Sequence, residues 1–210
     1  MNSVLWKDGK VINLGTLGGY ESVSTKVNER GQVLGNSTNS VPDPYSFVYN
    51  FFAQISNGTQ NRAFLWDQKN GMQDLGTLGG PDTVASDMNE RGQIVGISYT
   101  SFTPNPDTGI PSMHPFLWDH GRMIDLGTFG GTLTTPPGGK INERGQVIGS
   151  TNLSGDTETH PFFWDKGKLT DIGTLGGTLG FANALNDAGD VAGQATTADG
   201  PFMRSSGAAA

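Results

Sequence analysis

Three short phrases recur along this chain in a fixed order, and this repetition limits the possible folds more than any other feature. Successive copies of one apolar residue, at Leu14, Leu75, Leu126 and Ile172, are 61, 51 and 46 residues apart. Periods of roughly 40 to 50 residues are typical of propellers and helical arrays. The copies are "NLGTLGG" (13–19), "DLGTLGG" (74–80), "DLGTFGG" (125–131) and "DIGTLGG" (171–177); "VNERGQVLG" (27–35), "MNERGQIVG" (88–96), "INERGQVIG" (141–149) and the looser "LNDAGDVAG" (185–193); and "RAFLWD" (62–67), "HPFLWD" (114–119) and "HPFFWD" (160–165).

Each repeat contains four segments with the character of β-strands. "GQVLG", "AFLWD" and "GMQDLGT" are short, rich in β-branched or aromatic residues, and bounded by turn residues. "NERG" is a turn in which Asn can bond its own backbone and Gly accepts positive φ, and the Trp-Asp phrases lead into hairpins that contain Gly. In the first repeat we expect strands over Ser22–Asn28, Gln32–Asn36, Ala63–Asp67 and Met72–Thr77.

These strands predict an all-β fold, a β-propeller of four-stranded antiparallel blades, because one such sheet cannot bury both of its faces alone. A β-solenoid or flat array is the alternative. The chain opens inside a repeat, with strands at Val4–Trp6 and Val11–Thr16. We therefore expect four blades, with these N-terminal strands closing the last one and removing free sheet edges. The repeats of this single domain (1–204) are 20–80, 81–131, 132–177, and 178–204 completed by 1–19; 205–210 is a tail outside the fold.

This count leaves one strand too many. Both "VLW" (4–6) and "PFM" (201–203) match the third strand of the last blade. Either the C-terminal copy is displaced, or the chain is part of a longer array that closes by self-association, and a homodimer is one expectation.

The composition fits this fold and excludes several functions. The chain has 210 residues, 32 of them glycine, and only 34% are hydrophobic, which does not suit a helical bundle. The net charge of −7 without a Lys/Arg cluster argues against nucleic acid. The chain lacks cysteine, which excludes thiolate metal sites, and no apolar run approaches the ~20 residues of a membrane span. The start lacks signal-peptide features, so any export signal is absent or was removed.

The repeated phrases resemble the bacterial extracellular repeat family called HAF after its His-Ala-Phe phrase. That phrase stands here as Arg62-Ala63-Phe64, His114-Pro115-Phe116 and His160-Pro161-Phe162, and the Gly-Thr-Leu-Gly-Gly and Asn-Glu-Arg-Gly phrases follow the same pattern. The last copy departs from it, with Arg204 in place of Trp. The resemblance implies an exported or surface protein, and it carries over no catalytic residue.

A ligand site is expected where the variable loops gather. The connections between second and third strands vary most, and all of them leave the same end of an antiparallel sheet. Tyr45, Phe47, Tyr49 and Phe51 alternate in the first loop, so they either pack on a blade, form a ligand platform, or form a self-association surface. The four loops are 37–61, 98–113, 151–160 and 196–200.

Two histidines and several acids are candidates for chemistry at this end. His114 and His160 begin equivalent third strands and could act as general bases or metal ligands, although Arg62 in the same position favours loop capping. Exposed loop acids are usually just solvated. Around a pocket mouth they could instead hold a divalent metal such as Ca²⁺ or act as acid and base. The acids are Asp156 and Glu158 beside His160, and Glu21 and Asp82 in the links between blades.

Lys26, Asp87 and Lys140 occupy equivalent positions in successive first strands, two residues before the turn Asn. They predict either a charge network between blades or, from the two lysines, an anion site. No nucleophile–base pair or phosphate-loop motif is recognisable by spacing. The leading hypothesis is an extracellular module that binds a carbohydrate or other surface ligand; the alternatives are a small hydrolase, for esters, phosphoesters or glycosides, and a protein-interaction scaffold.

Overall fold

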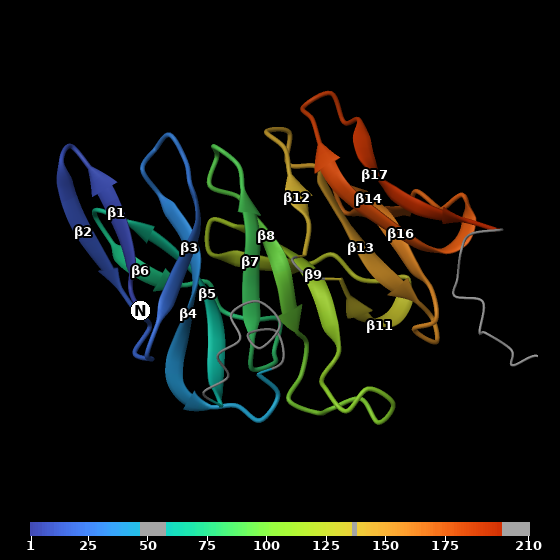
Figure 1. Cartoon of the computed structure of the whole chain (residues 1–210), viewed down its shortest axis with the longest axis horizontal. Helices are drawn as coiled ribbons and strands as arrows, with labels where there is room; N and C mark the ends of the chain where they lie inside the picture. Colours follow the sequence, from blue (N-terminus) through green and yellow to red (C-terminus); the bar gives the residue numbers. More distant parts are fainter. Residues whose placement is uncertain (47–57, 136–137, 199–210) are drawn as a thin grey trace, which may run out of the picture.

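The computed structural model describes residues 1–46, 58–135 and 138–198, and within these ranges the chain is all β-strand and connecting turns (Figure 1). Three four-stranded antiparallel sheets follow one another along the chain, with half a sheet at each end. The first whole sheet contains β3 (Ser22–Val27), β4 (Val33–Pro42), β5 (Thr59–Asp67) and β6 (Gly71–Asp74); the second contains β7 (Thr83–Met88), β8 (Ile94–Tyr99), β9 (Met113–Asp119) and β10 (Arg122–Asp125).

In the third sheet the first strand is divided in two. Both β11 (Gly130–Thr134) and β12 (Lys140–Ile141) pair with β13 (Val147–Leu153), which pairs with β14 (Thr159–Asp165) and through it with β15 (Lys168–Asp171). The terminal halves are the hairpins β1 (Ser3–Lys7) with β2 (Lys10–Gly15) and β16 (Gly176–Leu185) with β17 (Val191–Thr197). One parallel bridge, Thr159 to Leu179, joins β16 to the third sheet.

The strands expected from the sequence are present, and their ends differ where side chains act on the backbone. The predicted fourth strand continued to Thr77, but β6 stops at Asp74 because the Asp74 carboxylate accepts the N–H of Gly76 and turns the chain. In contrast, β4 and β5 run beyond their predicted ends into the first long loop, where they keep pairing as far as Pro42 and Thr59.

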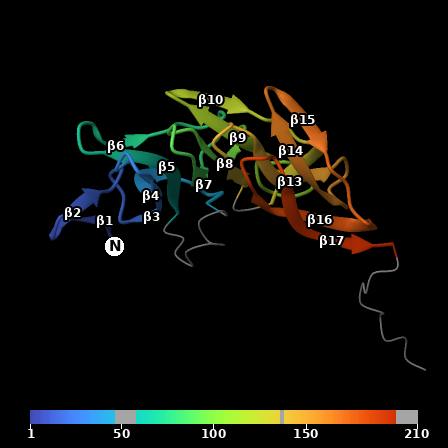
Figure 2. The same ribbon diagram turned by 90° about the horizontal axis from the view of Figure 1, so that it is seen from above.

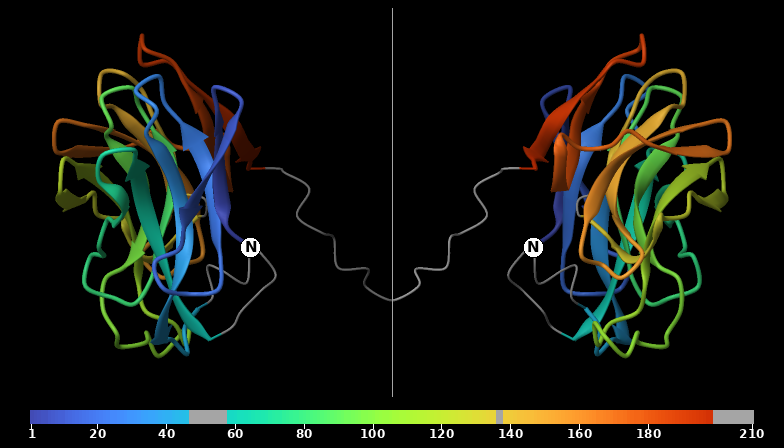
Figure 3. Two further views of the ribbon diagram at one scale, coloured as in Figure 1. Left: turned by 90° about the vertical axis from the view of Figure 1, so that its left-hand side faces the viewer. Right: turned by 90° about the vertical axis from the view of Figure 1, so that its right-hand side faces the viewer.

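The sheets stand side by side in chain order and form a curved row (Figure 2). Viewed along the row, they overlap closely (Figure 3). The β3–β4 and β7–β8 turns lie at the upper end in Figure 1, and the long β8–β9 connection lies at the lower end. The described part of the chain thus places its shortest turns and its longest loops at opposite ends, as the sequence predicted.

The expected closure of the last blade by the N-terminal strands does not occur in this structure. The β1–β2 and β16–β17 hairpins lie at opposite ends of the row, and within the described residues β1 pairs only with β2 (Figures 1 and 2). Leu5 and Ile12 of the N-terminal hairpin contact a buried cluster that includes Val33 and Trp66 of the first whole sheet, as a neighbouring blade would. The row stays open because the turn from each sheet to the next does not bring β17 round to β1 (Figure 2).

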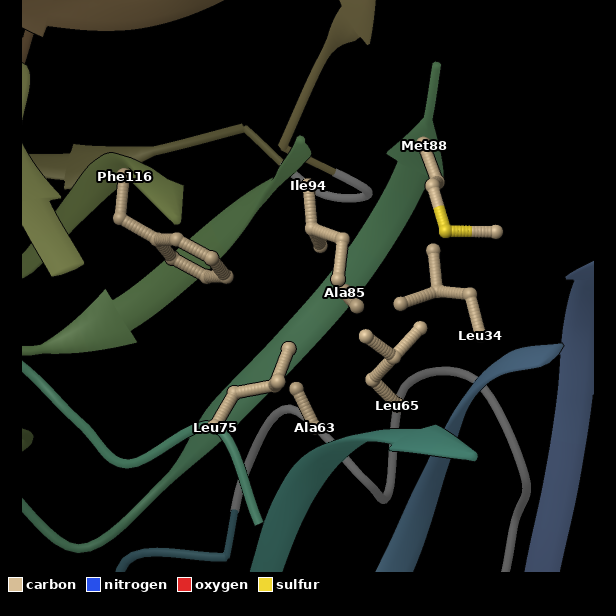
Figure 4. Close-up of a cluster of buried hydrophobic side chains, with 8 residues drawn as sticks. All are labelled: Leu34, Ala63, Leu65, Leu75, Ala85, Met88, Ile94 and Phe116. Carbon is tan, nitrogen blue, oxygen red and sulfur yellow. The ribbon is translucent and has the colours of Figure 1, made fainter. Parts of the chain in front are cut away.

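Apolar side chains fill each junction between sheets. Second-strand Leu34 and third-strand Leu65 of the first sheet meet Met88 and Ile94 of the second (Figure 4). An equivalent cluster, which includes Leu117, Leu126 and Val147, joins the second and third sheets. The core is therefore a series of similar layers, each built by two neighbouring repeats.

Candidate functional site

The residue that begins each third strand pairs with the Asp that ends the fourth strand of the same sheet. Arg62 Nε lies 3.0 Å from Asp74. His114 Nδ1 lies 2.9 Å from Asp125, and His160 Nδ1 lies 2.8 Å from Asp171. The three positions that sequence reasoning grouped as catalytic or ligand-binding thus share one local arrangement.

These aspartates also hold the turn after the fourth strand. Asp125 and Asp171 accept the N–H of Gly127 and Gly173 at 2.8 and 2.7 Å. Partial burial raises the pKa of Asp125, but the hydrogen bonds from His114 and Gly127 outweigh it and leave that pKa below its ordinary value. Every hydrogen bond of the His114 and His160 imidazoles in the structure goes to a carboxylate. The arrangement is that of a structural cap.

Of the two predicted loop acids, Glu158 lies beside His160, whereas Asp156 bonds to another part of the third sheet. Asp156 ties its loop to β11, because its carboxylate accepts the N–H and hydroxyl of Thr132 at 2.8 and 2.6 Å. Burial raises the pKa of Asp156, while these bonds lower it, and the net shift is downward. Glu158 lies 3.5 Å from His160 Nε2. Both acids therefore organise the β13–β14 loop.

The first-strand charges form half of the predicted network. Lys26 Nζ contacts Asp87 Oδ1 at 2.6 Å, and Asp87 Oδ2 accepts the N–H of Ile141 from the third sheet at 3.2 Å. Lys140 lies apart from this pair and lines a pocket of about 110 Å³ with Ser150 and residues of β16. The two lysines therefore do not form one anion site.

A buried pair of carboxyl groups lies between the first and second sheets, where the long loops begin. Asp82, in the link before β7, is 1% exposed, and Asp43, just after β4, is 3% exposed. Burial and, after it, the charge of the neighbouring Asp43 together raise the pKa of Asp82 to about 8, although the Asn61 N–H and the charge of Arg62 lower it. Asp82 therefore holds a proton at neutral pH unless a cation replaces it.

Several buried oxygens here lack a hydrogen-bond partner among the described residues when both acids are charged: Oδ2 of Asp43, Oδ2 of Asp82, Oδ1 of Asn61 and Oγ of Ser46, which follows Asp43 by three residues. When Asp82 holds its proton, the two carboxyl groups share a side-chain hydrogen bond, so their oxygens are unpaired only once that proton is lost. Asn61 is held beside the pair, because its backbone N–H donates to Asp82 Oδ1 at 2.8 Å and its amide donates to the Thr83 carbonyl. Unpartnered buried oxygens are costly in a protein interior. Two carboxylates with amide and hydroxyl oxygens are ligands that suit a hard cation such as Ca²⁺.

Two tyrosines border the carboxyl pair. Tyr99 donates its hydroxyl to the Tyr45 carbonyl at 3.0 Å, and burial together with the charges of Asp82 and Asp43 raises its pKa. Tyr45 packs against a cluster that includes Val84 and Tyr99 of the neighbouring sheet, which is the packing alternative left open for the first loop. Tyr49, Phe47 and Phe51 lie outside the described residues.

Glu21 occupies the position in the first sheet that Asp82 occupies in the second. It is buried as well, and its carbonyl accepts the N–H of Thr38 at 3.0 Å. The chain before Glu21 is the β1–β2 hairpin, whereas the chain before Asp82 includes β4 and Asp43. The predicted ring of acids is thus one buried pair, Asp43 with Asp82.

Sequence reasoning missed four parts of this site: Asp43, Ser46, Asn61 and Tyr99. The only signal was the "DPYS" turn at 43–46, in which Asp43 accepts the N–H of Tyr45 at 2.9 Å. It also missed two exposed aromatics in connections at the long-loop end, Tyr20 at 77% and Phe102 at 61% exposure. Nothing in their spacing distinguishes them from solvated loop residues.

Comparison with known proteins adds no further assignment. No protein-family model matches the chain, and no curated protein matches it. Within the described ranges, no helix is long and apolar enough to cross a membrane, and no three His, Cys, Asp or Glu side chains form a group that could hold a metal ion. The Asp43–Asp82 site has only two acidic groups and relies on neutral oxygens for the rest.

Proposed function

We propose that this chain is an exported binding module that holds a divalent cation, Ca²⁺ by its ligand chemistry, beneath its long-loop end. There it recognises a carbohydrate or other surface ligand. The observation that carries this proposal is the buried Asp43–Asp82 pair, whose oxygens lack partners among the described residues once Asp82 has lost its proton. Because Asp43 lies in the first long loop and Asp82 in the link to the next sheet, a cation between them would fix the loop on the scaffold.

The aromatic residues at the same end support a carbohydrate as the ligand. Tyr20, in the link before the first sheet, and Phe102, in the long loop of the second, both expose large apolar surfaces. Exposed aromatic rings on a fixed scaffold are typical of sites that bind rings or apolar surfaces. The resemblance to bacterial extracellular repeats agrees with an exported, surface-directed role. A hydrolase is less well supported, because the equivalent pair of the first sheet, Arg62 with Asp74, has the same arrangement and a guanidinium cannot act as a general base.

Calcium binding to the purified chain tests the first part. Isothermal titration should show saturable binding of CaCl₂ to the wild type and its loss in Asp82→Asn, which removes one charge and keeps the side-chain size. The matched control is Asp107→Asn, because Asp107 is exposed in the second long loop, away from the pair. A wild type without saturable heat, or an Asp82→Asn variant with unchanged affinity, would overturn the cation site.

A glycan array tests the second part. We expect binding to a subset of polysaccharides in CaCl₂, weaker binding in EDTA, and a loss of at least tenfold in affinity for Tyr20→Ala or Phe102→Ala. Phe129, which is partly buried in a junction between sheets, is unsuitable as a control because it supports the core. Tyr20 and Phe102 variants with wild-type melting temperatures and wild-type binding would show that the ligand binds elsewhere. If no glycan on the array binds, the carbohydrate assignment is wrong.

A further inference from the structure

The two half-sheets at the ends of the row are complementary parts of one sheet. In every whole sheet the second strand pairs with the third, as β4 does with β5 and β8 with β9. The C-terminal hairpin supplies a first and a second strand, and the N-terminal hairpin supplies a third and a fourth. Among the described residues, the outer edge of β17 is an unpaired second strand, and β1, which pairs only with β2, is a third strand.

Exposed apolar residues mark both halves as incomplete. Trp6 of β1 is 73% exposed, whereas its counterpart Trp66 in the first whole sheet is 7% exposed. Ile172 is 45% exposed, although the equivalent Leu75 and Leu126 are 7% and 5% exposed. Ile172 borders a groove of about 250 Å³ that Leu175, Phe181 and Val191 also line. In whole sheets, the third-strand Phe and Trp fill the corresponding space.

A ladder of hydrogen bonds between the turns is also unfinished at both ends. The N–H of Glu29 donates to the carboxylate of Glu90, that of Glu90 to Glu143, and that of Glu143 to Asp187, at 2.8, 2.8 and 2.9 Å. In the described part of the chain, the Asp187 N–H has no acceptor and the Glu29 carboxylate has no donor. If the two ends of the row met, the Asp187 N–H could donate to the Glu29 carboxylate and add one more hydrogen bond of the same kind.

The charges at the two free edges are opposite. In the second sheet, Gln93, just before the second strand, donates to Asp119 at the end of the third strand at 3.1 Å, and Gln146 and Asp165 repeat this in the third sheet at 3.4 Å. The equivalent residues of the half-sheets are Asp190, just before β17, and Lys7, at the end of β1. The whole sheets therefore have a Gln–Asp pair at this position. Where the two half-sheets would meet, the pair is Asp190 with Lys7, which have opposite charges.

From these observations we propose that the chain associates head to tail with a second copy of itself, so that β1–β2 of each copy completes the sheet begun by β16–β17 of the other. Two copies would then form a ring with the content of eight four-stranded sheets, within the four to eight blades that propellers have. In such a ring, the strand edges at both junctions are paired. Most stable oligomers are closed in this way.

Disulfide trapping tests which strands meet. By the register of the whole sheets, where Val33 pairs with Trp66 and Leu34 with Leu65, Ala192 should lie opposite Leu5 of the second copy. Directly opposed strand residues are close enough for a disulfide. The chain has no cysteine of its own, so there is no background. A mixture of Leu5→Cys and Ala192→Cys chains should give an oxidised product of twice the 22.2 kDa chain mass.

The double variant Leu5→Cys/Ala192→Cys separates the alternatives. A cross-linked product of single-chain mass would show that the chain closes on itself and would overturn the proposal. Absence of any cross-link in the mixture would overturn it as well, since the β17 edge would then be open or occupied by the "PFM" phrase. Each single-cysteine chain, oxidised alone, is the control for random collision.

Charge reversal gives an independent readout by light scattering. Lys7→Asp and Asp190→Lys should each be monomeric, because like charges face each other at both junctions. Mixing the two variants restores an opposite pair at each junction and should restore the dimer. Lys168→Asp, an exposed lysine at the start of β15, should stay dimeric. Two single variants that remain monomeric when mixed, although each is folded by circular dichroism, would contradict head-to-tail contact.

Discussion

At the scale of single residues, the repeat positions are explained by close contacts with a neighbouring strand or sheet. The glycine in each second strand is an example. A Cβ on Gly96 would overlap the Val84 carbonyl oxygen and lie 2.8 Å from the ring of Phe116. Gly35 and Gly149 have the same phenylalanine contact, with Phe64 and Phe162. The phrases "GQVLG", "GQIVG" and "GQVIG" therefore end in glycine because neighbouring backbone and a third-strand ring together occupy the side-chain space.

Replacing Gly96 with alanine should destabilise the fold through this contact. Overpacking a well-filled core typically costs about 1–3 kcal/mol, and we expect Gly96→Ala to lower the free energy of unfolding by an amount in this range. Gly193→Ala in β17 is the matched control: its Cβ would meet the Phe181 carbonyl but no aromatic ring. Urea denaturation measures both. An equal or larger loss for Gly193→Ala would show that the ring contact is not the cause.

The Asp82 carboxyl group gives the chain an unusual dependence on pH. Its pKa rises from 3.8 to about 8 on folding, mainly through burial. Between these values the folded chain keeps a proton that the unfolded chain releases, so the free energy of unfolding falls as the pH rises. In EDTA we expect a decrease between pH 4 and pH 8 in the wild type.

Thermal denaturation at several pH values, always with the chelator present, checks this. Asp82→Asn should have a flatter profile and relatively higher stability at pH 8, because the amide has no charge to bury. Asp107→Asn should keep the wild-type slope. If the profiles of wild type and Asp82→Asn run parallel, Asp82 does not titrate in the way its environment indicates.

At the scale of elements, the Asn-Glu-Arg-Gly turn connects the first and second strands of a sheet, and it also forms a hydrogen bond to the next sheet. The Asn89 side-chain oxygen accepts the N–H groups of Arg91 and Gln93, at 3.1 and 3.0 Å. Its amide donates to Gln93 within the turn and to the Asn142 carbonyl of the next sheet. The sequence predicted the local part from the turn signature of Asn and Gly. The contact to the next sheet required the tertiary structure.

Asn89→Ala and Asn186→Ala separate these two roles. Asn186 bonds to its own turn through the N–H and carboxylate of Asp190, but no further sheet follows it within the described residues. We expect Asn89→Ala to lose more stability than Asn186→Ala by about 1–3 kcal/mol, the cost of leaving a buried polar group without its partner. Urea denaturation at low protein concentration provides the comparison. Equal losses would show that the contact between sheets adds nothing.

At the scale of the whole molecule, stability should vary along the row. In a repeat architecture each unit is stabilised by its neighbours, and units with one neighbour open first. The second sheet contacts both other whole sheets through buried clusters. The residues of β16 and β17 are mostly exposed or half-buried, whereas those of β7 and β8 are almost all buried. The terminal hairpins are therefore the weakest part of a single copy.

Amide hydrogen exchange should reveal this gradient and its relief by association. At low concentration we expect β7, β8 and β9 to exchange slowest and β1, β2, β16 and β17 fastest. At concentrations that favour the head-to-tail dimer, protection should rise in β1 and β17 and stay constant in β8. Exchange that is uniform along the chain, or that does not depend on concentration at β1 and β17, would contradict this picture.

The sequence by itself determined the repeat, its four strands and the roles of its turns, because these depend on local backbone preference and on alternation within one repeat. It also indicated that the long loops share one end. Only the tertiary structure decided that the described strands form an open row, that Asp43 and Asp82 meet while His114 and His160 pair with structural aspartates, and that the ends leave complementary edges. These features depend on contacts between residues tens of positions apart, and a repeated pattern does not encode how far each sheet turns on the next.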